Sequence, residues 1–379
     1  MLRQCLAIIG REVRYLLRDR SLRHILLLGS LLGLLLFWGI YGAQVLKDIP
    51  TAVVDLDGTK QSRELVETIR NAEYLKVVAM PESFEEMEEM IKQGRAVVGV
   101  VIPEGYGKKV ALHRQVRVLL VIDGSNIIYA TNASTSILTV TRTIGAKAGI
   151  AALLAKGFSP SQAEDAYRGI EVESEPWFNP TLNYAYFLVL GLALNIWQQC
   201  CILTACMNVI GETGVESWRQ IRAAGVSRLR LFFSKSVVHI VFFMLVVLPV
   251  YLLAFEVFKL PLRCGFMELM LFTLVFAVAV HSIGTLMSSF ANSAVNSSRF
   301  GMIVAIPSFV ISGFTWPVEA MPQWLRPISK FFPQTWFFQG INLFTFKNAG
   351  WEMMAHYMLV MAAIAACCYT LSALFISRS

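Results

Sequence analysis

Six long apolar runs constrain this chain more than any other feature of its sequence. A helix that spans a bilayer needs about 20 predominantly apolar residues. The first run is ILLLGSLLGLLLFWGIYGA at residues 25–43, and the other five lie at residues 184–209, 231–255, 267–289, 300–316 and 354–376. Only 16% of the 379 residues are charged, against about 25% in soluble domains. The pattern predicts an α-helical polytopic membrane protein with six transmembrane helices.

The charges predict which side of the membrane each segment faces. Residues 44–180 carry a net charge of −3, and the rest of the chain carries +10. Basic loops stay on the cytoplasmic side, so both termini are expected inside. Residues 1–23 are expected to form an amphipathic interfacial helix, followed by a first transmembrane helix at 24–44. The basic residues flank apolar runs and form no patch in a soluble domain, which argues against nucleic-acid binding. No disulfide or metal site is predicted.

Residues 45–180 have the pattern of an extracytoplasmic α/β domain inserted between the first and second apolar runs. TAVVDL, LKVVAM, AVVGVVI and VRVLLVID are short β-rich runs, with helical patterns between them. Such alternation predicts a mainly parallel sheet. A long helical pattern follows at residues 126–156. The DLDG sequence at 55–58 is expected to form a strand-to-turn transition, because its spacing does not fit a calcium loop.

The segment GETGVESWRQIRAAGVSRLRLFFSK at residues 211–235 fills a cytoplasmic gap within the five-helix domain at 181–379. Thr213 and Glu216 are spaced as a capping box, and Gly225 suits a helix end. A helix this short is marginal in water without a surface to pack on. Two alternatives stay open: an interfacial helix that rests on lipid headgroups, or a docking element for a cytoplasmic protein.

This segment resembles the coupling segment of type 2 ATP-binding-cassette exporter permeases, in the branch with a large ectodomain. Its matching positions are Glu212, Glu216, Val226, Ser227, Arg228 and Lys235, whereas Gly225 stands where the family often has Pro. Three further stretches resemble the family: VVDLDGTKQSRELVETI with VIDGSN, PWFNPTLNYAYF, and the hairpin at residues 312–341. The resemblance implies a coupling helix at 211–230 that contacts an ATPase. The implied coupling residues are Glu212, Thr213, Glu216, Trp218, Arg219, Arg222 and Arg228.

The resemblance also implies partners. The family works as a dimer, either of one chain or of paired sister subunits, driven by separate cytoplasmic ATPase subunits. The chain has no G-x-x-x-x-G-K-[ST] phosphate loop. We therefore expect no enzymatic activity of its own, with ATP and Mg²⁺ bound by the partner ATPase. A periplasmic adaptor is a further partner that stays open, and membrane lipid surrounds the helices.

Polar residues inside apolar runs are candidates for a conduit or a dimer interface. Asn195, Gln198 and Gln199 share one stretch of the second run, and His281 lies within the fourth. The alternative is interhelical hydrogen bonding, which we favour for His239. Gly29 and Gly33 form a GxxxG close-packing signal in the first run.

The hairpin at residues 312–341 combines helix-breaking prolines with large aromatic residues. Broken helices at membrane depth are tolerated where they are buried in protein or line a cavity. We expect an outer gate, with an aromatic belt at the membrane surface as the alternative. The gate residues are expected to be Phe314, Trp316, Pro317 and Trp324.

These features predict a permease subunit of an ATP-driven exporter in the bacterial cytoplasmic membrane. No strongly charged site is apparent within the apolar runs, so a hydrophobic or amphiphilic cargo, drug-like or lipid, is expected. The alternative is a membrane-anchored sensor or assembly scaffold, whose outer α/β domain binds a ligand or partner without transport.

Overall fold

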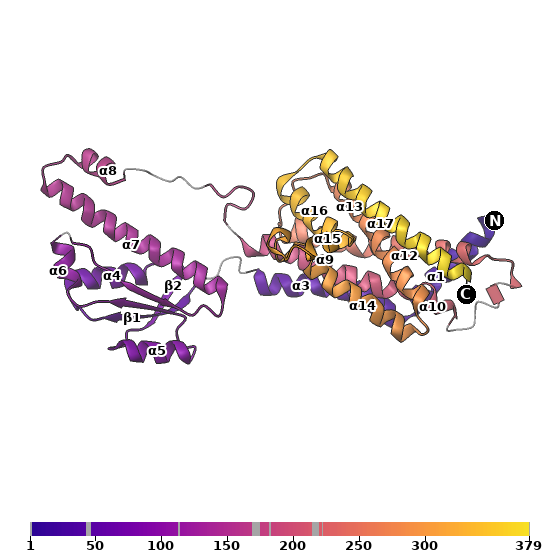
Figure 1. The fold of residues 1–379 in the computed structure, drawn as a ribbon, viewed down its shortest axis with the longest axis horizontal. Coiled ribbons are helices and arrows are strands. Elements are labelled where there is room, and N and C mark those ends of the chain that lie inside the picture. The colour runs from indigo at the N-terminus through magenta and orange to yellow at the C-terminus, as the bar shows by residue number, and fades with distance from the viewer. Residues whose placement is uncertain are drawn as a thin grey trace. The chain divides into compact units, whose positions relative to one another are not determined.

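The change from apolar to polar sequence coincides with a division of the chain into two units (Figure 1). Unit 1 comprises Met1–Gln44 and Pro176–Ser379, and unit 2 comprises Val45–Glu175. The structure is a computed structural model. It describes residues 2–42, 47–112, 114–168, 175–181, 183–213, 220–221 and 223–378.

Unit 1 is a helical bundle. Its N-terminal part consists of α1 (Leu2–Arg18), α2 (Arg20–His24), a π-helical turn (Ile25–Gly29) and α3 (Ser30–Tyr41). Its second part consists of α9 (Tyr184–Ala205), α10 (Ile210–Thr213), α12 (Arg228–Leu252) with a π-helical end (Leu253–Val257), α13 (Phe266–Phe290), α14 (Ala294–Val310), a 3-10 turn (Val318–Ala320), α15 (Leu325–Ser329), α16 (Pro333–Lys347) and α17 (Trp351–Arg378). Helix α13 packs against α9, α12, α14, α16 and α17, so it lies at the centre of the bundle.

Among the described residues, five helices are long and apolar enough to cross a membrane: Ile127–Ala155, Tyr184–Ala205, Arg228–Val257, Phe266–Phe290 and Trp351–Ile376. Four of them coincide with apolar runs of the sequence. The first run forms a shorter apolar helix, Ile25–Tyr41, and the run at 300–316 corresponds to the 17-residue α14. The fifth long helix belongs to unit 2. The chain is thus mostly helical, with several candidate membrane spans and a small sheet.

Aromatic side chains fill the core of unit 1. The rings of Phe276 and Phe337 stack with their centroids 3.8 Å apart, and Trp197 donates its indole N–H to the carbonyl oxygen of Phe243 at 3.2 Å. The GxxxG glycines of the first run face α9: a Cβ atom on Gly33 would lie 2.8 Å from the side chain of Ile196. Close approach of α3 to α9 therefore requires glycine at this position.

Unit 2 contains a four-stranded sheet in the order β2-β1-β3-β4. Its strands are β1 (Ile49–Asp55), β2 (Leu75–Ala79), β3 (Val98–Ile102) and β4 (Leu119–Ile122), and each overlaps one of the four β-rich runs. Strand β1 pairs in parallel with β2 and β3, whereas β4 is antiparallel to β3. Its helices are α4 (Lys60–Arg70), α5 (Phe84–Lys92), α6 (Tyr106–Ala111), α7 (Ile127–Ala155) and α8 (Pro160–Arg168).

Helices cover both faces of this sheet. Val53 of β1 packs in one cluster with α4, α6 and α7, while its neighbours Ala52 and Val54 pack against α5 on the opposite face. This alternation follows from the two-residue period of a strand. The DLDG sequence forms the turn from β1 to α4: Asp57 accepts hydrogen bonds from the Thr59 hydroxyl and the Gly107 amide, at 2.5 and 2.8 Å. These bonds lower the pKa of the Asp57 carboxyl.

Candidate functional site

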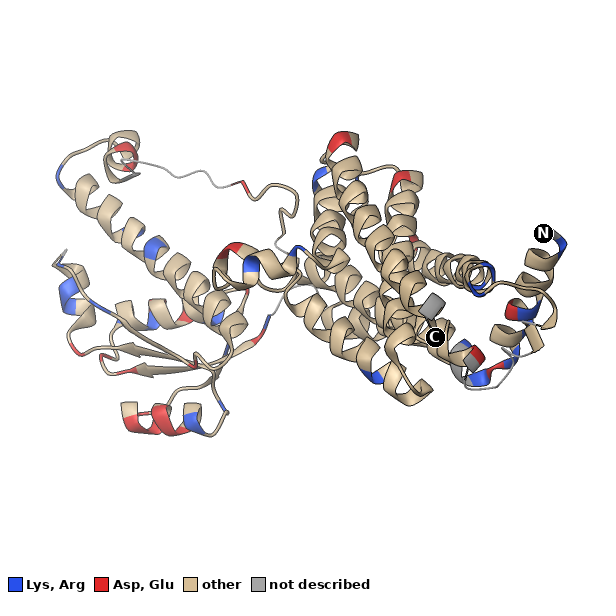
Figure 2. Cartoon of the chain, turned by 45° about the vertical axis from the view of Figure 1, so that its right-hand side comes forward, with Lys and Arg blue, Asp and Glu red and all other residues tan. Residues whose placement is uncertain are grey.

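Charged residues are frequent at the end of unit 1 that holds the N-terminus, around α1, α10 and the start of α12 (Figure 2). Five of the titratable residues there are buried: Glu12, Glu212, Lys235, His239 and His281. They come from α1, α10, α12 and α13, and we call them the buried charge cluster. Ionised groups removed from water cost several kcal/mol each unless they are paired, so the contacts within the cluster decide whether this arrangement is stable.

One ammonium group lies between two carboxylates. The Nζ atom of Lys235 donates to Oε1 of Glu212 at 2.9 Å and lies 3.6 Å from Oε1 of Glu12. The guanidinium of Arg11 pairs with the same Glu212 oxygen from the more exposed side. Within the described residues, Lys235 and Arg11 are thus two cations that face these carboxylates. The side chains of Glu12 and Lys235 are only 2–3% exposed, so solvent screens their attraction little.

Local sequence explains how these groups meet. Ser227 caps α12 by accepting from the Arg230 amide, which places Lys235 on the second helical turn. Glu12 lies one turn from both Ile8 and Leu16, and all three side chains are buried. Residues four apart share a helix face. The face of α1 that packs on α12 therefore carries a single carboxylate between apolar residues.

A chain of hydrogen bonds continues from Glu12 across three helices. Nε2 of His239 lies 2.9 Å from Oε1 of Glu12, and its Nδ1 lies 3.1 Å from Nε2 of His281. Nδ1 of His281 lies 2.8 Å from the hydroxyl of Tyr369 on α17. Burial alone raises the pKa of Glu12, but the hydrogen bond from His239 and the positive charge of Lys235 outweigh it, and the net effect lowers that pKa. Glu12 is therefore held as a carboxylate. It forms one end of this chain of hydrogen bonds, and Tyr369 forms the other.

Comparison with known proteins identifies the class of this molecule. The family described as ABC-2 family transporter protein matches residues 20–374. The chain belongs to this family. The resemblance seen in the coupling segment, the hairpin and the two stretches around the outer domain is thereby confirmed. The buried charge cluster is therefore part of the membrane permease of an ABC transporter, a transmembrane component that works with an ATPase.

Individual ABC-2 relatives match most of the chain. The "Probable multidrug ABC transporter permease YbhR" of Escherichia coli K12 is 24% identical over 326 residues, which cover 85% of this chain and 84% of the relative. The "Inner membrane transport permease YhhJ" of the same organism is 22% identical over 86% of this chain and 84% of the relative. YbhS, named as a "Probable multidrug ABC transporter permease", is 21% identical over 51% of this chain and 52% of its own length.

The ABC-2 coupling segment is described in part. Glu212 is buried with its carboxylate directed at Lys235 and Arg11. Thr213 is the last residue of α10, and Glu216, which would complete its predicted capping box, lies outside the described residues. Arg228 donates to the carbonyl oxygen of Ile376 at 2.8 Å, which joins α12 to the end of α17. Four predicted coupling residues lie outside the described residues: Glu216, Trp218, Arg219 and Arg222.

The polar residues predicted for a conduit or dimer interface fall into two separate places. Gln198 and Gln199 both donate to Oδ1 of Asn195, and Gln198 also accepts from Gln334 of α16 at 3.0 Å. Gln198 also donates to the carbonyl oxygen of Ala305 at 3.4 Å, so this residue of α9 contacts both α14 and α16. His281 is not among these partners and lies in the buried charge cluster. The Oε1 atom of Gln334 is buried and has no hydrogen-bond partner among the described residues.

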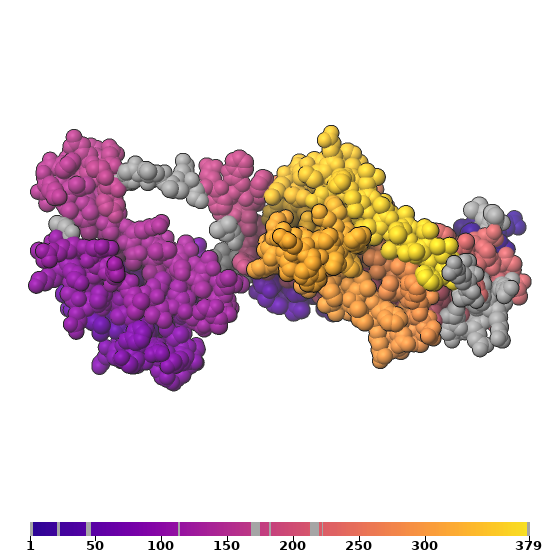
Figure 3. Space-filling model, in the orientation of Figure 1, coloured from indigo at the N-terminus to yellow at the C-terminus, as the bar shows by residue number. Residues whose placement is uncertain are grey.

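The outer hairpin lies at the end of unit 1 far from the N-terminus, and its light-orange segment forms part of the surface in Figure 3. Phe314 is buried and stacks on Phe187 of α9 with ring centroids 5.4 Å apart. A Cβ atom on Gly191 would overlap the Phe314 ring, so glycine at this position admits the ring. Trp316 and Trp324 are 59% and 67% exposed. Phe314 is thus buried, as a residue of a closed gate would be. The two tryptophans are exposed, as residues of an aromatic belt at the membrane surface would be.

Sequence reasoning missed the role of Glu12. The expectation that the apolar runs contain no strongly charged site is wrong, because the buried Lys235 lies in the run at 231–255 and pairs with carboxylates from residues 12 and 212. No local pattern predicts a pairing across 200 residues. One signal was present: Glu12 is the single acid on the buried face of an arginine-rich amphipathic helix, and a buried charge demands a partner.

Unit 2 holds a separate groove between α7 and the segments around α6 and β4. Its volume is about 790 Å³, within the range of small-molecule sites. Half-buried apolar side chains line it, among them Val116, Ile144 and Leu153. Its charged lining residues within the described part of the chain are Arg114 and Lys156, both basic. The groove would suit an elongated apolar molecule with a negative group.

Proposed function

We propose that the chain is the permease subunit of an ATP-driven exporter in the bacterial cytoplasmic membrane, with both termini in the cytoplasm. Membership of the ABC-2 family supports an ABC permease, and two relatives are named as probable multidrug permeases. The structural observation that carries the proposal is the attachment of Glu212. This residue of the coupling segment is buried and ion-paired to α12 and α1, so a force on the segment reaches the bundle directly.

In this proposal, six transmembrane helices form the subunit and α7 belongs to the outer α/β domain. A cytoplasmic ATPase binds ATP and Mg²⁺, closes, and pushes on residues 211–230 and on α1. The push shifts the bundle between inward-open and outward-open arrangements, whose populations the nucleotide state biases. A second permease subunit, identical or a sister chain, completes the complex. A periplasmic adaptor is a further partner that the outer domain could contact.

The cargo in this proposal is hydrophobic or amphiphilic, a drug-like molecule or a lipid. The buried charge cluster does not argue for a charged cargo, because its carboxylates and cations satisfy one another. The far end of the bundle is lined by aromatic side chains around Phe314, including Phe187, Phe309 and Phe338. These rings are mostly buried against one another, so in this proposal the apolar cargo meets them when the outer end of the bundle opens.

Copurification with the ATPase and measurement of cargo-stimulated hydrolysis test this function. Glu216→Lys should weaken ATPase binding and coupling while membrane insertion stays normal. Glu85→Lys is a matched control, because Glu85 is an exposed acid of α5 in unit 2 outside the coupling segment and α1. Normal coupling in the Glu216→Lys variant, or a wild-type protein that copurifies with no ATPase, would contradict the proposal.

The groove of unit 2 favours a second candidate function, ligand sensing by the α/β unit without transport. Its size and its basic residues, Arg114 and Lys156, suit a fatty-acid-like ligand. A fluorescent fatty acid added to the full-length protein in detergent should then bind, and Arg114→Ala with Lys156→Ala should weaken the binding. Binding with no ATPase partner and no export would favour the sensor over the exporter.

A further inference from the structure

We propose that Glu12 is a positioning residue that sets the proton positions of His239, His281 and Tyr369, and through them connects α1 and the coupling segment to α13 and α17. The inference rests on the proposed function and names the path by which a push from the ATPase reaches the inner part of the bundle. Its basis is the row of contacts Glu12–His239–His281–Tyr369, each between 2.8 and 3.1 Å.

The donor and the acceptor of each hydrogen bond in this row can be assigned, and all the bonds then point in one direction. An ionised carboxylate only accepts, so Nε2 of His239 must carry the hydrogen that faces Glu12. The other nitrogen of a neutral imidazole only accepts, so Nε2 of His281 must donate to Nδ1 of His239. Nδ1 of His281 is then an acceptor, and the Tyr369 hydroxyl donates to it. One carboxylate on α1 therefore determines the tautomer of two histidines and the orientation of a hydroxyl on α17.

The row responds to the coupling segment because two donors share one oxygen. Nζ of Lys235 and Nε2 of His239 both lie near Oε1 of Glu12, at 3.6 and 2.9 Å respectively. Lys235 lies closer to Glu212, at 2.9 Å. If a push on the segment moves Glu212 away, the ammonium shifts toward Glu12 and competes with His239 for the same oxygen. The hydrogen bond between His239 and Glu12, which fixes the tautomers of the two histidines, then weakens. The directions of the hydrogen bonds along the whole row are then no longer fixed.

The charged and titratable groups around the row are few, which keeps this competition local. Within the described residues, Arg11, Glu12 and Tyr15 face it from α1, Glu212 from α10, Lys235 from α12, and Cys368 and Tyr369 from α17, while α13 contributes only His281. Arg11 remains on Glu212, so it follows the segment. Lys235 is then the cation that exchanges between the two carboxylates.

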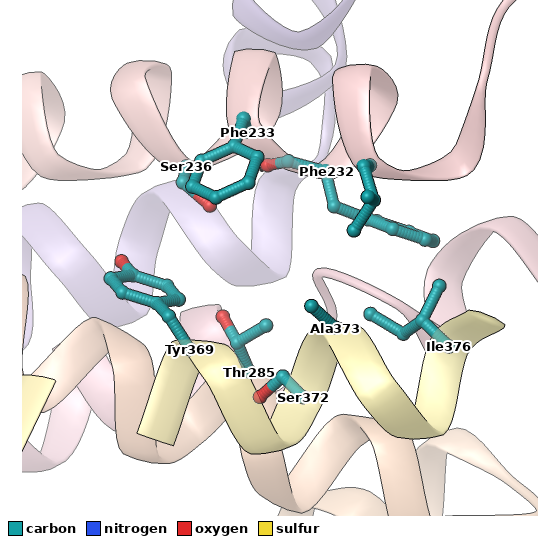
Figure 4. A pocket seen from close by; sticks show the side chains of 9 residues that line it. Phe232, Phe233, Ser236, Thr285, Tyr369, Ser372, Ala373 and Ile376 are labelled. Carbon is teal, nitrogen blue, oxygen red and sulfur yellow. Dashed lines mark hydrogen bonds between the residues drawn. The ribbon is translucent and has the colours of Figure 1, made fainter. Parts of the chain in front are cut away.

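The far end of the row adjoins a small pocket between α12, α13 and α17 (Figure 4). Its volume is about 20 Å³, close to that of one water. Hydroxyl groups of Ser236, Thr285, Tyr369 and Ser372 are among its lining groups. The pocket gives the Tyr369 hydroxyl alternative partners when His281 no longer accepts from it. In this proposal the row has a second arrangement, in which the Tyr369 hydroxyl turns to the pocket, as a switching element requires.

The test uses the full permease reconstituted with its ATPase in lipid nanodiscs, and its probe does not depend on the cargo. A cysteine introduced by Trp324→Cys in an otherwise cysteine-free chain reports on the outer hairpin, since Trp324 is 67% exposed. Its labelling rate with a soluble maleimide is compared between nucleotide-free and vanadate-trapped complexes, and ATP hydrolysis and thermal stability are measured on the same samples. The variants are Glu12→Gln, Tyr369→Phe, the double variant, and Glu256→Gln as the control, because the Glu256 side chain is 75% exposed and lies outside α1 and the row.

The expected result is a loss of communication without loss of hydrolysis. Glu12→Gln and Tyr369→Phe should each reduce the nucleotide-dependent change in labelling rate by about fivefold or more, the lower range of allosteric coupling. The double variant should be no worse than the more severe single variant, because both act on one row. Glu256→Gln should behave as wild type. Tyr369→Phe removes only a hydroxyl, so it keeps the test informative if Glu12→Gln fails to fold.

Three results would overturn the inference. The first is an unchanged labelling response in folded Glu12→Gln and Tyr369→Phe. The second is additive effects in the double variant. The third is lower thermal stability in both single variants with a normal labelling response, which would assign the row a purely structural role. A wild-type complex that binds no ATPase would instead overturn the proposed function, and this inference with it.

Discussion

Lys235 illustrates how one residue can hold three segments together. Its ammonium contacts carboxylates from α1 and α10, while its own backbone belongs to α12. Removing one member of a buried ion pair leaves an uncompensated charge, whereas removing both members at once is often tolerated. The two carboxylates would also repel each other without the ammonium between them. The stability of this region is therefore sensitive to which partner is changed.

Replacing Lys235 with Met should destabilise unit 1 by about 3–5 kcal/mol, the usual cost of breaking a buried pair. The double change Lys235→Met with Glu212→Gln should recover a large part of that loss. Lys259→Met is the matched control, because its ion pair with Glu256 is 74–75% exposed and exposed pairs contribute less than about 1 kcal/mol. Unfolding in detergent measures all three. Equal losses for Lys235→Met and Lys259→Met would contradict the buried ion-pair assignment.

The lowered pKa of Glu12 predicts a pH dependence. A carboxyl whose pKa is lower in the folded state stabilises the fold above its ordinary pKa, here 4.5. That contribution decreases as the pH falls from about that value through the folded-state pKa. The difference in unfolding free energy between wild type and Glu12→Gln should thus be constant from pH 6 to pH 8, and should shrink below about pH 4.5. A difference that grows on acidification would rule out a stabilised carboxylate.

The close contact of Gly191 and Phe314 predicts the behaviour of the outer hairpin. Gly191→Ala places a Cβ atom within the ring of Phe314, so the ring must move, at a cost of about 1–3 kcal/mol. Phe314→Ala should cost about 3–5 kcal/mol and, if the hairpin gates exit, should alter export or basal ATP hydrolysis. Trp316→Ala is the control, because Trp316 is exposed. Normal export in folded Phe314→Ala would remove the gate hypothesis.

At the scale of elements, α1 packs on protein along one face. Ile8, Glu12 and Leu16 are buried, and Leu16 packs with Val238 of α12. The sequence predicted an amphipathic helix on the membrane surface, and its period is that of the observed α1. The arginines remain on its other faces, so contact with α12 and contact with lipid headgroups are compatible.

Cysteines at positions 16 and 238 should therefore cross-link through a short bifunctional thiol reagent. The pair Leu16→Cys and Val238→Cys is placed in a cysteine-free chain in native membranes. Leu17→Cys with Val238→Cys is the control, because Leu17 is 49% exposed and lies on another face of α1. Cross-linking that is as fast for position 17 as for position 16 would show that α1 is not fixed against α12.

Elements with a strong local signal could be predicted from the sequence, and those set by distant contacts could not. The long pattern at 126–156 agrees with α7, because Asn126 caps that helix by accepting from the Ile128 amide. The predicted bounds of the fifth apolar run, 300–316, are offset from those of α14. This helix starts after the capping residue Ser293 and ends at Val310. The last residues of the run, 311–316, include Ile311, Phe314 and Trp316 but form a turn, and hydropathy does not distinguish a turn from a helix.

The same distinction applies to the candidate site. The coupling segment was found because its residues are adjacent in the sequence and resemble a family. The partners of Glu212 were not found, since Arg11 and Lys235 lie 201 and 23 residues away. His239 and His281 appeared as isolated polar residues in two apolar runs, and only the packing of α12 on α13 brings them within hydrogen-bond distance.

At the scale of the whole molecule, the side of the membrane assigned to each unit depends on α7. Its length and composition would allow it to cross a membrane. Its first half nevertheless packs on the sheet through Ala133, Ile137 and Val140. A sheet edge within lipid would leave backbone groups without hydrogen-bond partners. A helix that covers this sheet is therefore expected to remain with it outside the bilayer.

Thiol labelling of intact cells decides between these two positions of α7. Single cysteines introduced by Lys60→Cys on α4 and Ser161→Cys on α8 flank α7 along the chain, and both residues are exposed. If α7 covers the sheet, both cysteines lie on one side and react with an impermeant maleimide applied from outside. Gln220→Cys in the coupling segment should react only after the membrane is opened. If α7 spans the membrane, Lys60→Cys and Ser161→Cys must give opposite results, and the topology with six membrane helices and both termini inside must be abandoned.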